Sequence, residues 1–337
     1  MAPPSNVDGT VSISSLHLDV LHHHILSRLD GPSLAALSCT SSELNALSSY
    51  DKLWQQICTS TWPSVNHPLV THAVSTFPSA HRSLFSDSYP LLLHRHSCHD
   101  LDRPFPATRE LISAVDIYYQ NVPIFSTVEA TETVTGWFLS SPFRVDLVGP
   151  EEFIPTRIQQ IGEKNSWLRQ LQENITLSWI LIDPQKKRAM NMSSQRAVSV
   201  RRHWLTGEVQ VKFASILAGD GGMGSERESV QCEIMVTCGG EEGGEVHVRD
   251  VSMVMEDMEG KVLSGKESLV IVDGAMERGE RRKEKSGEEG KERYNEFVGR
   301  RRDRRERKHR REKIWDLVCI ASGFSSLMAF CSFLLLS

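Results

Sequence analysis

The chain has 337 residues, of which 39% are hydrophobic and 24% are charged, and its formal net charge is −5 at pH 7. This length exceeds one typical domain and predicts two folded units with additional tails. Residues 274–313 hold 17 Lys and Arg against 10 acidic residues, so the part before them carries a net charge of −11, which excludes nucleic acid as its partner.

Residues 1–12 are polar and predict a disordered N-terminus without a basic and apolar secretory signal. The seven cysteines form no C-x-x-C pair and are too scattered for a disulfide framework. These features indicate a reducing compartment and predict no disulfide framework.

Residues 13–60 predict a module of three short helices. Leu18, Leu21, Ile25 and Leu29 recur at spacings of three and four, which places them on one helix face. Asp30-Gly31-Pro32 ends the first helix, and Ser41-Ser42 separates the next two. Short helices so rich in Leu cannot bury that surface alone, so they must pack on one another and on a partner.

This pattern resembles an F-box, the motif through which substrate adaptors bind Skp1 in Skp1-cullin-F-box ubiquitin ligases. Ile25-Leu26-Ser27-Arg28-Leu29, Pro32, Leu34, Leu47 and Leu53-Trp54 fall on the family's apolar and turn positions. His17-Leu18 replaces the usual Leu-Pro opening, and Leu44 replaces the usual central Trp. The segment from Leu29 to Ser42, followed by Thr61-Trp62-Pro63-Ser64, is similar to one group of plant F-box proteins.

The resemblance implies binding to a Skp1-like protein and, through it, to a cullin. The contact residues that it implies are Leu18, Leu21, Ile25, Leu26, Leu29, Pro32, Leu34, Leu37, Leu47, Leu53 and Trp54. A Leu-rich helical bundle with no connection to a ligase is the alternative interpretation of the same pattern.

Residues 61–121 predict a helical connector. Prolines punctuate it into short helices, the longest over Ala80–His94, and Leu111, Val115 and Tyr118 predict a further helical turn or two. His94, His96 and Cys98 alternate as zinc ligands could in an extended segment, but the flanking Pro90 and Pro104 favour a simple connector.

Residues 122–273 predict an antiparallel, sandwich-like β domain, because alternating β-branched and aromatic residues replace the helical period. Only Gln159–Glu173 has helical character. The predicted strands are Val122–Val128, Gly136–Ser140, Arg144–Val148, Ile175–Ile182, Val198–Trp204, Gly207–Leu217, Val230–Cys238, Glu245–Met255 and Leu269–Val272. In F-box proteins the module after the F-box selects the substrate, so this domain is the candidate receptor for an unknown protein. It also resembles, weakly, a lectin-like sandwich found in some plant F-box proteins.

No catalytic motif is evident. Gly219–Gly224 spells G-x-G-x-x-G, but a strand rather than a helix follows it, which favours a hairpin loop over a nucleotide site. The sequence therefore predicts a non-catalytic protein without cofactor or bound metal.

Residues 274–313 predict a charged linker ending in a basic collar, and residues 314–337 predict a transmembrane tail anchor, since Leu317–Leu336 is free of charge. The predicted anchor residues are Trp315, Leu317, Phe324, Leu327, Phe330, Phe333 and Leu336. The residues predicted to bind lipid headgroups or set topology are Arg300, Arg301, Arg302, Arg304, Arg305, Arg310, Arg311 and Lys313.

Together these features predict an α+β protein: an F-box with a helical linker, a β-rich domain and a single C-terminal membrane helix. The predicted function is a substrate adaptor of a ubiquitin ligase, tethered to the endoplasmic reticulum or another endomembrane with its body in the cytosol. Two alternatives stay open. One is a membrane-attached β-sandwich that binds a glycan or lipid, and the other is nuclear import through the collar and Arg281-Arg282-Lys283.

Overall fold

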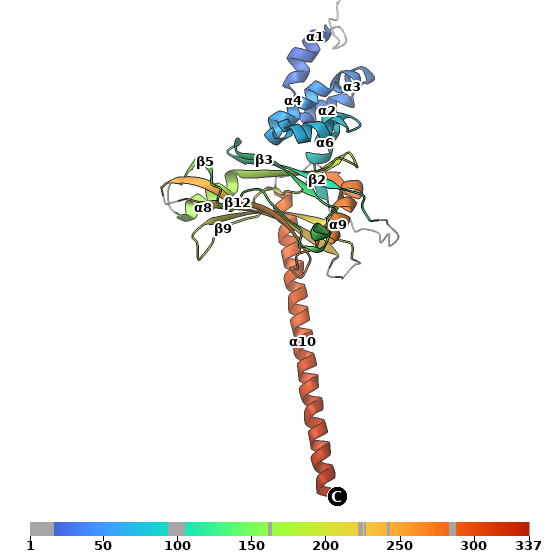
Figure 1. Cartoon of the computed structure of the whole chain (residues 1–337), viewed down its shortest axis with the longest axis vertical. Coiled ribbons are helices and arrows are strands. Elements are labelled where there is room, and N and C mark those ends of the chain that lie inside the picture. Colours follow the sequence, from blue (N-terminus) through green and yellow to red (C-terminus); the bar gives the residue numbers. More distant parts are fainter. Residues whose placement is uncertain are drawn as a thin grey trace, which may run out of the picture.

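The computed structural model describes residues 17–93, 105–160, 164–221, 225, 227–240, 243–282 and 288–336. Three layers follow one another in space: a layer of short helices, a five-stranded sheet and a six-stranded sheet (Figure 1). A long C-terminal helix leaves the body on the side opposite the helical layer (Figure 1).

The helical layer contains the first seventy or so described residues. Its first helical segment is α1 (Leu18–Val20), η2 (Leu21–Ile25) and η3 (Leu26–Arg28), and it ends two residues before Asp30, where the predicted stop begins. Asp30 and Ser41 then cap the next two helices, each side chain accepting a backbone N–H three residues ahead, at 2.9 and 3.2 Å. The remaining elements are α2 (Gly31–Ser38), α3 (Ser42–Ser48), α4 (Asp51–Thr61), η4 (Pro63–Asn66), α5 (Pro68–Ser75) and α6 (Ala80–Ser88).

The two main sheets are antiparallel. The five-stranded sheet has the order β3-β2-β6-β7, with β8 paired to β6; its strands are β2 (Glu110–Tyr119), β3 (Val122–Glu132), β6 (Ile175–Asp183), β7 (Arg188–Asn191) and β8 (Gln195–Arg196). The six-stranded sheet has the order β4-β12-β11-β10-β9, with β5 paired to β12. Its strands are β4 (Arg144–Asp146), β5 (Ile154–Gln159), β9 (Ser199–Arg202), β10 (Val209–Ala218), β11 (Ser229–Gly239) and β12 (Glu245–Glu256). A separate short pair joins β1 (Leu91–Leu93) to β13 (Glu280–Arg282).

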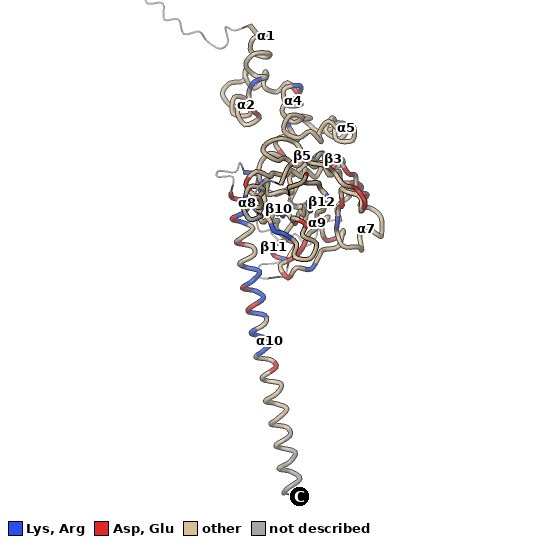
Figure 2. Tube along the Cα trace, turned by 90° about the vertical axis from the view of Figure 1, so that its left-hand side faces the viewer, with Lys and Arg blue, Asp and Glu red and all other residues tan. Residues whose placement is uncertain are grey.

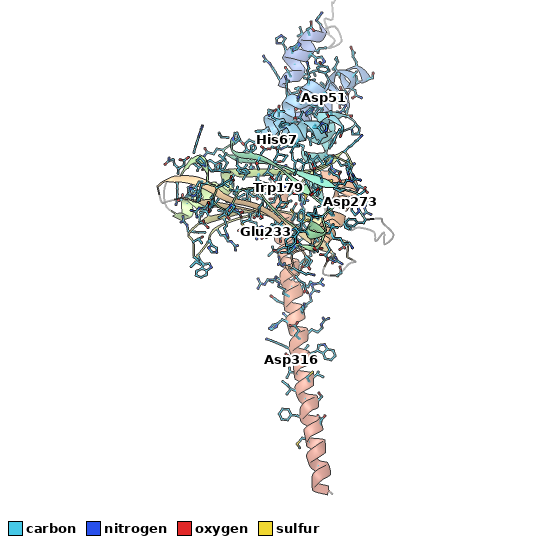
Figure 3. All side chains as sticks on the ribbon, viewed as in Figure 1. Asp51, His67, Trp179, Glu233, Asp273 and Asp316 are labelled. Carbon is cyan, nitrogen blue, oxygen red and sulfur yellow. The ribbon has the colours of Figure 1, made fainter. Side chains whose placement is uncertain are left out.

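The main core lies between the two sheets. Val115 and Trp179 from the five-stranded sheet share it with Phe213 and Ile234 from the six-stranded sheet, and all four side chains are fully buried. Figure 3 shows Trp179 in this position, inside the sandwich. α8 (Lys164–Asn174), the helix predicted within this domain, closes one end of the core with Trp167.

The opposite face of the five-stranded sheet is also covered. Ile112, Ala114 and Ile180 pack there against Trp62 and Val74 of the helical layer, in a second core. The central strands β2 and β6 are therefore buried on both faces, and the helical layer forms one continuous body with the β domain.

That double burial explains one wrong prediction. The helical connector was expected to continue to residue 121, whereas Glu110–Tyr119 forms the central strand β2. Seven successive residues, 111–117, are buried in it, so the strand lacks the alternation by which a half-exposed strand is recognised.

Two predicted strands are helices. Gly136–Ser140 is α7, and Leu269–Val272 lies inside α9 (Gly265–Arg278). α9 begins with a capping box, because the Ser264 side chain accepts the Glu267 N–H and the Glu267 carboxylate accepts the Ser264 N–H. A short apolar run does not distinguish a strand from a buried helix by itself, and here the cap decides for the helix.

The predicted transmembrane tail is wrong, and with it the single-pass membrane localisation. The segment belongs to α10 (Glu289–Leu336), and within the described part of the chain no helix combines the length and the apolar character that crossing a bilayer requires. The prediction rested on the length of the uncharged segment Leu317–Leu336. Of the predicted anchor residues, Trp315, Leu317 and Phe324 are exposed. Figure 3 shows the neighbouring Asp316 far from the body. The side chains of the other predicted anchor residues, Leu327, Phe330, Phe333 and Leu336, lie outside the described residues.

The predicted charged linker is largely ordered helix. Phe297 of α10 is fully buried against Ile216 and Met258. Arg301 pairs with Glu256 at 3.4 Å, and Lys308 pairs with Glu259 at 2.9 Å, so part of the basic collar holds α10 on the β domain (Figure 2). Two further arginines of the collar also contact the β domain, since Arg304 and Arg305 donate to the backbone carbonyls of residues 225 and 259. Three others, Arg300, Arg302 and Arg310, form ion pairs with glutamates of α10 itself. Arg311 and Lys313 are exposed.

A buried carboxylate joins the helical layer to the central strand. Asp116 of β2 is fully buried and accepts hydrogen bonds from the Ser64 N–H at 3.0 Å, the Ser64 hydroxyl at 2.6 Å and the Ser126 hydroxyl at 2.7 Å. Burial raises the pKa of Asp116 above its ordinary value of 3.8, although these hydrogen bonds oppose the shift.

We expect Asp116→Asn to change how stability depends on pH. With its pKa raised, Asp116 in the folded protein holds a proton that the unfolded chain has released, so its contribution to stability falls as pH rises from 3.8 through the raised value. Asparagine cannot take up this proton. The free energy of unfolding of the wild type should therefore rise relative to that of the variant as pH is lowered from 7 towards about 4, measured by urea denaturation. Parallel curves for the two proteins would contradict this assignment, and the exposed Asp19→Asn provides the control.

Candidate protein-docking site

The predicted Skp1-contact residues divide into a buried and an accessible group. Leu21, Leu26, Leu34, Leu53 and Trp54 are buried in the helical layer. Leu29, Pro32, Leu37 and Leu47 are half-buried, and Ile25 is exposed; the side chain of Leu18 lies outside the described residues.

Trp54 is the centre of the buried group. Its Nε1 donates to the Ser48 carbonyl at 2.7 Å, its ring lies 5.4 Å from that of Phe85, and the Arg82 guanidinium lies over it at 5.9 Å. The backbone of Gly31 packs so closely on Phe85 that an added Cβ would lie 2.1 Å from the ring. These contacts fix the relative positions of α2, α4 and α6, so the buried group supports the module from inside.

The accessible group forms an apolar face on the outside of the same helices. Ile25 is 40% exposed, and two residues that the pattern did not single out add to the exposed apolar surface, Val20 at 41% and Tyr50 at 50%. Tyr50 meets His22 edge to face, with 5.2 Å between ring centroids. Periodicity could not identify Tyr50 because it lies in the turn before α4, outside any helix. An exposed apolar face on helices this short is typical of a site that a protein partner covers.

The other candidate sites are not assembled. His22, His23 and His24 follow one another on η2, and the described residues contain no group of three side chains placed to hold a metal ion. The proposed His94, His96 and Cys98 site lies outside the described residues. Gly219 and Gly221 lie between β10 and β11 and are followed by the strand β11, while Gly222–Gly224 lie outside the described residues.

The alternative nuclear-import signal, in which the basic collar acts together with Arg281-Arg282-Lys283, also lacks support. Arg281 is half-buried in β13, where it lies 3.6 Å from the Asp87 carboxylate and donates to the Met276 carbonyl at 3.0 Å. A side chain held in this way is not available to an import receptor, and Lys283 lies outside the described residues.

Comparisons with known proteins identify the family of the helical segment. Residues 19–60 match the family model described as F-box-like, the segment that carries both the buried and the accessible group. No solved structure matches the chain.

Three Arabidopsis thaliana proteins are similar along nearly the whole chain. F-box protein At2g27310 is 44% identical over 100% of both chains, F-box protein At3g44326 is 48% identical over 90% of this chain and 85% of its own, and probable F-box protein At2g36090 is 43% identical over 95% and 93%. The similarity therefore extends through the β domain and beyond the docking module. The chain belongs to the plant F-box proteins.

Proposed function

We propose that this protein is a substrate-recognition adaptor of a Skp1-cullin-F-box ubiquitin ligase. The observation that carries the proposal is the F-box-like segment over residues 19–60, in which the apolar side chains of Val20, Ile25 and Tyr50 are exposed. A Skp1-like protein would cover these side chains and connect the adaptor to the cullin.

The proposed mechanism is proximity. The helical layer recruits the ligase, and the β domain holds a target protein, so that the target's lysines meet the charged conjugating enzyme at high effective concentration. The shared core between the helices and the five-stranded sheet supports this role, because it fixes the distance between the two binding surfaces.

Three of the described cysteines, Cys58, Cys232 and Cys238, are buried and are not placed to act as nucleophiles, whereas Cys39 and Cys319 are exposed. Burial raises the pKa of Cys58 and of Cys238 to about 12, and that of Cys232 is raised for the same reason, so these thiols stay protonated at neutral pH. A protonated, buried thiol cannot accept ubiquitin as a nucleophile.

The test is to place a charge on the accessible face. The double variant Val20→Asp, Ile25→Asp changes two exposed side chains, so the melting temperature should stay near that of the wild type. Capture of a plant Skp1-like protein should fall at least about tenfold, because each carboxylate would be desolvated in an apolar interface. Affinity measured by biolayer interferometry with purified proteins checks this result.

The matched control is Val122→Asp, which introduces the same charge at a 61% exposed valine at the start of β3. It should leave Skp1 binding unchanged. If the wild-type chain fails to bind the Skp1-like protein, or if the double variant binds as well as the control, the adaptor function is wrong.

A further inference from the structure

A cleft opens on the outer face of the six-stranded sheet, the face turned away from the helical layer. Its volume is about 380 Å³, and its floor is formed by Gln210, Thr237 and Asp250 from the adjacent strands β10, β11 and β12. The β9–β10 connection and the segment around Phe153 before β5 form its walls. The labels β5 and β9 in Figure 1 mark the end of the sandwich at which these lining segments lie.

Phe153 lines this cleft, and two further large apolar residues, Trp204 and Leu205, belong to the β9–β10 connection that forms one of its walls. Trp204 is 87% exposed, Leu205 is 71% exposed and Phe153 is 57% exposed. The loop that carries Trp204 is held in place, since the His203 N–H donates to the Glu208 carbonyl at 2.7 Å and the Gly207 N–H donates to the His203 carbonyl at 2.9 Å. An ordered loop that presents a bare tryptophan beside a cleft is typical of a protein-binding site.

The charges in the cleft favour a cationic ligand. Glu152, Glu208 and Asp250 line it together with a single guanidinium, that of Arg249. Arg249 is already engaged, because it pairs with Glu208 at 2.7 Å and lies 4.9 Å from the centre of the Phe153 ring. Gly239 leaves the space for it, since an added Cβ would lie 2.9 Å from the Arg249 Nε.

Two carboxylates then remain without an ion pair among the described residues. Glu152 accepts the Gly149 N–H at 3.1 Å, and Asp250 accepts the Ser252 hydroxyl at 3.1 Å. Arg144, the cation that acts on Asp250, makes its own close ion pair with Asp146 at 2.7 Å. Burial outweighs the influence of Arg144 and raises the pKa of Asp250, so a ligand cation would relieve an unfavourable desolvation there.

We propose that this cleft binds a basic segment of the substrate protein, in which an exposed Lys or Arg stands next to an apolar residue. The cation lies between Glu152 and Asp250, its aliphatic stem packs on Trp204, and the neighbouring apolar side chain contacts Leu205 and Phe153. This inference rests on the proposed adaptor function and names the substrate surface that the adaptor selects. Because the cleft and the helical layer lie on opposite faces of the sandwich, substrate and Skp1 can be bound at the same time.

The experiment selects short random peptides from a phage-displayed library on the full-length chain in complex with its Skp1-like partner. We expect enrichment of Lys or Arg beside Leu, Ile, Val or an aromatic residue. The enriched peptide, synthesised with a fluorescent label, should bind the wild type and lose at least about tenfold in affinity with Trp204→Ala and with the double variant Glu152→Gln, Asp250→Asn. Binding should also weaken as salt is increased.

Trp137→Ala is the matched control, because Trp137 is 81% exposed on α7, an element that contributes no residue to the cleft lining, whereas the connection that carries Trp204 contributes His203 and Thr206. It should leave peptide affinity unchanged. An absence of enrichment, enrichment of acidic or uncharged peptides, or an affinity that Trp204→Ala does not alter would overturn the proposal. Skp1 binding measured on the same preparations separates the two failures: if it persists while peptide binding is lost or absent, only the cleft assignment fails.

Discussion

Replacement of Asp87 with alanine is expected to lower the free energy of unfolding by about 3–5 kcal/mol, because it leaves two partly buried guanidinium groups without their carboxylate. Asp87 lies at the end of α6, where its carboxylate accepts the Arg188 Nε–H at 2.9 Å and the Ala189 N–H at 3.1 Å. Arg281 of β13 lies 3.6 Å away, and burial lowers its pKa although Asp87 opposes that shift. One carboxylate therefore connects the helical layer, the five-stranded sheet and the short pair β1–β13.

Thermal and urea denaturation of the full-length chain would measure this loss. The control is Asp19→Ala, whose carboxylate also faces a basic side chain, His17 at 3.3 Å, but is 80% exposed. That variant should unfold like the wild type, because exposed ion pairs contribute little. Equal stability of the Asp87 and Asp19 variants would show that the helical layer does not depend on the junction described above.

The sequence predicted the helical module well because its signals are local. The side chains of Asp30 and Ser41 cap the N-termini of α2 and α3, and such signals need no knowledge of the rest of the chain. The strands with one side facing the core, such as Val209–Ala218, were recognised from alternation for the same reason.

The errors arose where tertiary packing overrides the local pattern. β2 is covered on one face by the helices and on the other by the six-stranded sheet, so the period that identifies a strand disappears.

The candidate sites show the same limit. An apolar helical pattern does not reveal which residues fill the core and which remain for a partner, so Leu34 and Ile25 received the same role although Leu34 is fully buried and Ile25 is 40% exposed. The cleft could not be predicted at all, because Glu152, Trp204 and Asp250 belong to separate connections and strands that only the folded sheet brings together.

Trp54→Ala tests this division between core and contact residues. Trp54 is 2% exposed, and removal of its ring should cost about 3–5 kcal/mol of the free energy of unfolding, with loss of the hydrogen bond to the Ser48 carbonyl. The variant should therefore bind less Skp1 at growth temperature for the indirect reason that fewer molecules have a folded F-box.

Temperature separates this indirect effect from the loss of a contact. On cooling, or with a stabilising osmolyte, the folded fraction of the Trp54 variant should rise and Skp1 capture should recover with it, measured on the same samples by circular dichroism and by pull-down. The Val20→Asp, Ile25→Asp variant should stay folded throughout and should not recover binding. If the Trp54 variant melts like the wild type and still fails to bind, Trp54 contacts the partner directly, and the helices must open on binding to expose a side chain that the free protein keeps in its core.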